Sequence, residues 1–174
     1  MPLYLIKKMS SIQPVTKQFI LQSRLFNNVL EGIEDRKGSD RLSEYVNHLQ
    51  WIAGHLTNSR YHLGSAIGLN AHFPYAEAYT DLSQPPPHNR AIDPSVKYPS
   101  LTEIKKSWNE FAAGFAEKIS ALSSERLESE TAAGVPTGKT LSDLISFIAS
   151  HESYHIGQMS IIRKSLGMPA MSYK

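Results

Sequence analysis

The sequence contains no cysteine among its 174 residues. This absence excludes disulfide bonds, cysteine-ligated zinc, iron–sulfur clusters and a thiol nucleophile supplied by the protein itself. An excess of one charge is also lacking, because 18 Lys and Arg stand against 16 Asp and Glu, for a net charge of +2. So small an excess argues against nucleic acid or an anionic membrane surface as a partner.

Long hydrophobic runs are missing as well. No stretch is apolar over enough residues to cross a bilayer, and Lys7 and Lys8 follow a short apolar run, the reverse of the order in a secretory signal. Hydrophobic residues make up 41% and charged residues 20%, which is typical of a folded globular chain. We therefore expect one cytoplasmic domain spanning residues 1–174.

Four segments carry apolar residues at helical spacing, and none shows sustained strand-like alternation. The spacing predicts long helices over Pro14–Ile33, Arg41–Ile67, Ser100–Leu122 and Thr140–Leu166. Asp40 is a suitable cap for the second of these helices. Capping sequences open the third helix at Ser100 and the fourth at Thr140, and Gly167 follows the end of the fourth. The fold class predicted is all-α.

The two longer connections differ in composition. The connection between the second and third predicted helices, Leu69–Pro99, holds six prolines, including the run Pro85–Pro87, so no long helix can form there. Its aromatic residues favour an ordered segment that covers the core, and loops of this length are often functional. The other connection, Ser123–Lys139, contains Gly and Pro and is compatible with a small hairpin.

Histidines are the residues most suggestive of chemistry. His151 and His155 are four residues apart on the fourth predicted helix, so both project from one face, in line with its apolar positions. Because a buried imidazole without a partner is costly, a shared metal ion is a natural partner for the pair. His48, His55 and His62 are spaced by seven and share a face of the second helix, so any one of them could complete a three-histidine site.

The seven-residue spacing does not identify the third ligand, although the mid-helix position of His55 between Ile52 and Leu56 slightly favours it over the other two. His72 and His88 are interpreted as ordinary surface or loop histidines. Four further residues are candidates to orient the ligands or a substrate, or else belong to the solvated helix surface: Asn58, Glu152, Tyr154 and Gln158.

Two other metal sites are considered and rejected. His151-Glu152-Ser153-Tyr154-His155 matches the zinc-protease pattern H-E-x-x-H, in which Glu152 would be the general base. However, no His, Asp or Glu follows His155 as a third ligand, and no edge strand is predicted to bind a peptide. Glu152-x-x-His155 also matches half of a di-iron carboxylate site, but the second half is absent.

A single divalent ion on neutral nitrogens therefore remains. Such ligands suit zinc or nickel, with iron or manganese as further candidates. Three imidazoles would leave the ion's charge uncompensated and lower the pKa of a bound water. This arrangement supports either hydrolysis or activation of a thiol taken from solution.

Two motifs resemble the DinB-like family. They are Trp51-Ile52-Ala53-Gly54-His55-Leu56, followed by Ser59-Arg60, and His151-Glu152-Ser153-Tyr154-His155-Ile156-Gly157-Gln158. The resemblance implies a four-helix bundle with up-up-down-down order, and a long proline-rich connection between helices 2 and 3. It also implies one divalent metal on His55, His151 and His155, and frequent homodimers.

The function implied by this resemblance is a metal-dependent hydrolase acting on a small molecule, with Glu152 as a candidate catalytic residue. Two alternatives stay open. One is a metal-dependent thiol S-transferase or isomerase that uses a low-molecular-weight thiol. The other is a non-enzymatic, stress-associated binding dimer in which the metal only joins two helices.

Overall fold

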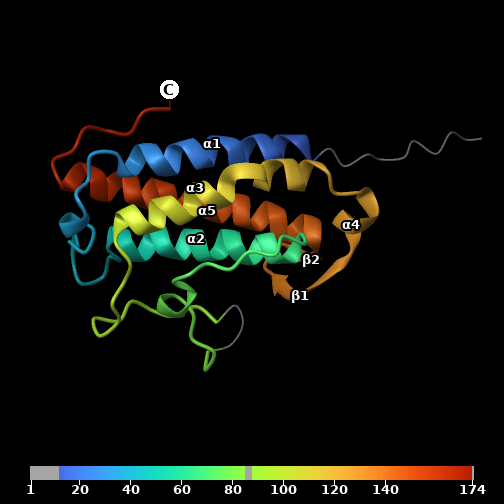
Figure 1. Cartoon of the computed structure of the whole chain (residues 1–174), viewed down its shortest axis with the longest axis horizontal. Helices are drawn as coiled ribbons and strands as arrows, with labels where there is room; N and C mark the ends of the chain where they lie inside the picture. The colour runs from blue at the N-terminus through green and yellow to red at the C-terminus, as the bar shows by residue number, and fades with distance from the viewer. Residues whose placement is uncertain (1–11, 85–87, 174) are drawn as a thin grey trace, which may run out of the picture.

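A computed structural model describes residues 12–84 and 88–173 of the chain (Figure 1). These residues are mostly helical, with five α-helices, four of them long. The long helices are α1 (Gln13–Leu30), α2 (Leu49–Ala66), α3 (Leu101–Ser120) and α5 (Leu141–Ser165). Short elements complete the fold: the 3-10 turns Asp35–Lys37 and Ala76–Ala78, α4 (Ser124–Glu128), and the antiparallel strands β1 (Glu130–Val135) and β2 (Gly138–Thr140).

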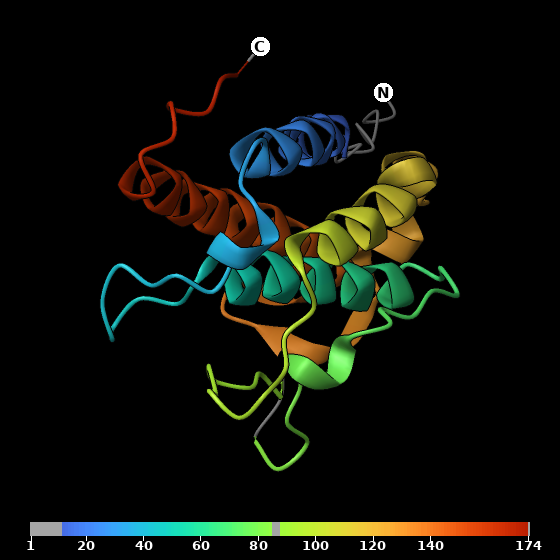
Figure 2. The ribbon, with the colours of Figure 1, turned by 60° about the vertical axis from the view of Figure 1, so that its left-hand side comes forward.

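Each long helix packs against two others. Helix α1 contacts α3 and α5, and α2 contacts the same two helices. Figures 1 and 2 show the four helices side by side, with α4 and the β1–β2 hairpin at one end. Their buried side chains form two apolar clusters, one containing Phe19 and Phe115 and the other containing Phe26 and Trp108. No helix within the described residues is both long enough and apolar enough to cross a membrane.

The predicted starts of α3 and α5 are confirmed. Ser100 accepts a hydrogen bond from the Glu103 backbone N–H, and the Glu103 carboxylate accepts one from the Ser100 backbone N–H. Thr140 and Asp143 form the same reciprocal pair at the start of α5. Both capping boxes satisfy backbone donors that a helix start would otherwise leave unpaired.

The start predicted for the second helix is wrong. Helix α2 begins at Leu49, and neither Asp40 nor Arg41 belongs to its first turn. His48 caps it instead, because its Nδ1 accepts a hydrogen bond from the Trp51 backbone N–H at 3.0 Å. Tyr45, which supported the longer helix by its spacing, is 87% exposed, so no buried face extends the helix backward.

The connection between α2 and α3 packs against α2 over much of its described length. Phe73 and Tyr79 are buried, and the Tyr79 hydroxyl donates a hydrogen bond to the Gln50 carbonyl at 3.1 Å. This approach requires Gly54, because a Cβ at that position would clash with the Tyr79 ring. The run Pro85–Pro87 lies outside the described residues. The hairpin considered for Ser123–Lys139 is present as β1 and β2, preceded by α4.

Helix α3 contains a kink that the periodicity did not predict. Ala113 and Gly114 leave helical geometry, and Gly114 adopts φ +82° and ψ −13°. A left-handed conformation of this kind suits glycine and strains residues that carry a Cβ.

We expect Gly114→Ala to lower the free energy of unfolding by about 1 kcal/mol, because alanine disfavours a positive φ. Gly157→Ala is the matched control, since Gly157 lies in regular helix and open space surrounds its Cβ position. That control should leave stability unchanged or raise it by up to about 1 kcal/mol. Urea unfolding followed by circular dichroism measures both, and a stabilising Gly114→Ala would contradict the assigned kink.

Candidate metal centre

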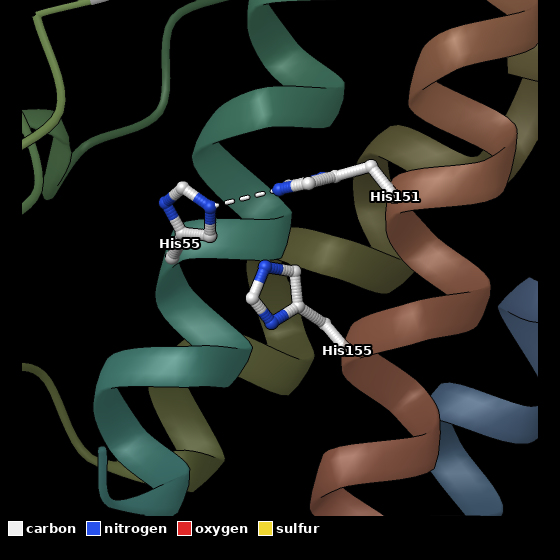
Figure 3. Close-up of side chains that lie close together, drawn as sticks. All are labelled: His55, His151 and His155. Atoms are coloured by element: carbon white, nitrogen blue, oxygen red, sulfur yellow. Dashed lines mark hydrogen bonds between the residues drawn. The ribbon is translucent and has the colours of Figure 1, made fainter. Parts of the chain in front are cut away.

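Three histidines from two helices meet at one point. His55 projects from α2, and His151 and His155 project from successive turns of α5 (Figure 3). One nitrogen from each ring can be chosen so that all three lie within 4.8 Å of one another. The Nε2 atoms of His55 and His151 are 3.0 Å apart. The structure therefore brings together the three histidines that the sequence selected, and the group could hold a metal ion.

Neighbouring side chains fix the orientation of two of these rings. The Trp51 ring stacks on His55, with centroids 4.8 Å apart and planes 12° apart. The Nδ1 of His155 lies 2.7 Å from the Gln158 Oε1, and the Gln158 amide donates to the Tyr154 hydroxyl at 3.0 Å. An Nδ1–H donated to Gln158 leaves the Nε2 lone pair of His155 available to a cation. The predicted orienting roles of Gln158 and Tyr154 thus have a geometric basis.

The three rings are poor bases in this environment. Burial, reinforced by repulsion from His151 and His155, lowers the pKa of His55 to about 3. Burial and repulsion from His155 lower the pKa of His151 to about 4, and burial also lowers the pKa of His155. All three imidazoles are therefore neutral near pH 7, which is the form that binds metals.

The donor set fits a divalent transition metal. A tetrahedral ion with metal–nitrogen bonds near 2.0–2.1 Å holds its ligand atoms about 3.3 Å apart, close to the observed separation of His55 and His151. Three protein ligands leave a coordination position for water or substrate, as in catalytic zinc sites. The buried Nδ1 of His151 has no hydrogen-bond partner within the described part of the chain, so no carboxylate orients that ring.

The other candidate histidines lie outside the cluster. His48 caps α2, as described above, and His62, His72 and His88 do not belong to the three-histidine group. Asn58, one turn after His55 on α2, donates a hydrogen bond to the Thr80 hydroxyl at 3.2 Å. It therefore joins α2 to the following connection.

The structure does not bring the Glu152 carboxylate to the histidines. Glu152 has no solvent exposure, and both of its oxygens accept hydrogen bonds from Arg60, with Nε to Oε1 at 2.7 Å. Burial raises the pKa of Glu152, and the Arg60 charge opposes that shift. Because the guanidinium cannot lose its proton, a neutral Glu152 would leave a buried charge uncompensated. Glu152 is therefore not part of the solvated helix surface, contrary to one interpretation of the sequence, and its carboxylate does not belong to the three-histidine group.

Arg60 belongs to the first family motif, but its role as the partner of Glu152 was not predicted from the sequence. The Arg60 Nη1 donates to the Ser23 hydroxyl at 2.7 Å, and its guanidinium carbon lies 3.6 Å from the Trp108 ring centroid. The Arg60–Glu152 pair thus joins α2 to α5 and also contacts α1 and α3. A signal was present, since Arg60 falls within the apolar positions of α2, but its partner is 92 residues away in sequence.

The lowered histidine pKa values predict acid sensitivity of the metal-free protein. Between the ordinary pKa of 6.5 and about 3, the unfolded chain binds a proton at His55 that the folded chain does not bind. The free energy of unfolding therefore falls as the pH drops below about 6.5. Urea unfolding from pH 6.5 to about 4.5 should show this fall, and His55→Gln should make it shallower by up to about 1.4 kcal/mol per pH unit. If the free energy of unfolding of His55→Gln depended on pH as steeply as that of the wild type, the lowered pKa of His55 would be contradicted.

Breaking the buried ion pair should be more damaging than removing it. We expect Glu152→Gln to lower the free energy of unfolding by about 3 kcal/mol or more, because Arg60 would keep an unpaired buried charge. The double variant Arg60→Met/Glu152→Leu should lose less than the sum of the two single variants. Thermal and urea unfolding measure this cycle, and additive losses would argue against a coupled pair.

Comparisons with known proteins agree with the family resemblance seen in the sequence. The family model described as DinB superfamily matches residues 18–159. A crystal structure of a conserved protein from Enterococcus faecalis superposes with a TM-score of 0.70 at 12% identity, covering 91% of this chain and 99% of that one. A DinB-like protein from Bacillus cereus ATCC 10987 gives a TM-score of 0.66 at 15% identity, covering 92% and 96%. No functionally curated protein matches significantly. The family match covers most of the sequence, and the chain belongs to the DinB superfamily.

Proposed function

We propose that this protein is a metal-dependent hydrolase of small molecules whose single divalent ion is held by His55, His151 and His155. The observation that supports this proposal most directly is the convergence of three imidazole nitrogens within 4.8 Å, with no carboxylate in the group. Zinc or nickel suits these ligands, and iron or manganese are the further metals to test.

A bound ion would supply Lewis-acid character and lower the pKa of a coordinated water. The chain's own residues would hold and orient the reactants. Gln158 fixes the ring of His155, and Trp51 covers one face of His55. Glu152 is proposed to act in positioning, because Arg60 occupies both of its oxygens.

The larger architecture belongs to the same proposal. The long helices run in up-down-down-up order, because α1 and α5 run parallel to each other and antiparallel to α2 and α3 (Figure 1), so the up-up-down-down order implied by the resemblance is wrong. Their pairwise packing supports a bundle that forms a single domain over residues 1–174. Exposed apolar side chains on α1 and α5, namely Ile20, Tyr154 and Ile161, provide a surface through which a homodimer could form. We place the protein in the cytoplasm, as its composition predicts.

The metal proposal predicts one ion per chain in the purified, untagged protein, lost in both His55→Ala and His151→Ala. Each variant removes one of three ligands, and alanine is compatible with either helix. His62→Ala is the matched control and should retain the metal, because His62 lies two turns along α2 from His55. Elemental analysis and the absorption spectrum of the cobalt-substituted protein measure the outcome. A wild-type protein that binds none of zinc, nickel, iron and manganese would overturn the proposal.

The same cobalt-substituted protein separates the possible activities. Turnover of a small ester or amide, lost in His151→Ala, supports hydrolysis. A spectrum that changes on addition of a low-molecular-weight thiol, without ester turnover, would instead favour thiol transfer. A spectrum unaffected by either probe, with a large loss of stability on chelation, would indicate a purely structural metal.

A further inference from the structure

A pocket of about 530 Å³ lies beside the C-terminal half of α2, under the connection that leads to α3. In Figure 1 this connection runs below α2, with the turn Ala76–Ala78 facing the helix. Apolar side chains form part of the pocket wall, including the buried rings of Tyr61 and Phe73. The volume and the mixed lining are typical of sites for small organic molecules.

One cation in this pocket is held in place but is not paired. The Arg90 backbone N–H donates to the Tyr79 carbonyl at 2.9 Å, and its Nη2 donates to the Thr80 carbonyl at 3.2 Å. Its Nε is buried and has no hydrogen-bond partner in the described ranges. No carboxylate of the described residues lies within ion-pair distance of its guanidinium.

The acidic residues nearby have other partners or remain in solvent. Asp81 accepts hydrogen bonds from Ser83, and Asp93 accepts hydrogen bonds from Ser95. Each is close enough to Arg90 for a weak attraction but forms no contact with it. Glu77 is the acid that lines the pocket itself, and it is exposed. Arg90 therefore offers an oriented guanidinium, without an ion-pair partner among the described residues, to a ligand in the pocket.

The pocket adjoins the three-histidine group. Asn58 and His62, which line it, follow His55 on the same face of α2, at a rise of about 5 Å and 10 Å. Asn58 also contacts Thr80, the residue whose carbonyl accepts the Arg90 hydrogen bond. A short chain of contacts thus connects the turn after His55 to Arg90.

We propose that this pocket binds a small molecule that carries a carboxylate on an apolar or aromatic body, with the carboxylate held by Arg90. Guanidinium groups recognise carboxylates through paired N–H donors, and the aromatic walls suit an apolar body. The further assignment of this molecule as the substrate rests on the proposed function. Its reacting bond would then lie on the side toward His55.

The test uses the metal-free, full-length protein and 2-naphthoate, with neutral 2-naphthamide as the isosteric control. Binding is followed by NMR on the methyl groups of Ala71 and Ala76, which line the pocket, with Ala149 in the core as a reference. We expect saturable shifts at Ala71 and Ala76 with naphthoate, and binding at least about tenfold weaker with naphthamide.

Three variants establish the role of Arg90. Arg90→Gln should weaken naphthoate binding about tenfold or more and leave naphthamide binding unchanged, whereas Arg90→Lys should lose less because it keeps the charge. Arg24→Gln, which removes an exposed arginine on α1, is the matched control and should bind as the wild type does. The thermal midpoint of each variant establishes that it is folded.

Several results would overturn the proposal. These are equal naphthoate binding by the wild type and Arg90→Gln, shifts confined to residues outside the pocket, and displacement by inorganic phosphate at lower concentration than naphthoate requires. Because no metal is present, failure here is distinct from failure of the proposed function. If the protein binds naphthoate but binds no metal, the pocket proposal stands and only the proposed hydrolase activity is contradicted.

Discussion

The ion pair between Arg60 and Glu152 is the constraint on which the arrangement of the long helices depends. Both side chains are fully buried, and taking two charges out of water is costly unless each hydrogen-bonding group is satisfied. Arg60 donates two hydrogen bonds to Glu152 and one to the Ser23 hydroxyl, and its guanidinium stacks on the Trp108 ring. These contacts together meet that requirement. They do so only when all four long helices hold one relative position.

The same constraint explains why the histidines meet. Successive residues of an α-helix project about 100° apart, so Glu152 faces the interior while His151 and His155 emerge beside it. Arg60 likewise follows His55 by five residues on α2. Fixing Arg60 against Glu152 therefore fixes the register of α2 on α5, and with it the 3.0 Å approach of the His55 and His151 nitrogens. The pair also lies between the two apolar clusters, since Arg60 contacts rings of both.

Local chemistry was predictable from the sequence, whereas pairing across the fold was not. The capping boxes at Ser100 and Thr140 and the spacing of the α5 histidines are decided within a few residues, and the structure confirms the caps. The choice of His55 came from a family motif rather than from spacing. Tertiary context decided the rest: α2 begins at Leu49, after the His48 cap, and Leu42 and Tyr45 before it are exposed. The role of Glu152 depended on a partner that no local pattern reveals.

The candidate metal centre and the Arg90 guanidinium in the pocket beside it share one electrostatic property, which is that neither is paired with a carboxylate of the described residues. Burial keeps the three rings neutral, and Arg60 sequesters Glu152, the acidic side chain adjacent to a ligand on α5. A divalent ion bound there would keep its full charge, because none of its three protein ligands is anionic. Arg90, which lines the pocket, adds a guanidinium that has no ion-pair partner among the described residues. Together with a bound ion, this guanidinium would favour a ligand that is anionic at one end and carries an electron-rich group, such as an acyl oxygen, at the other.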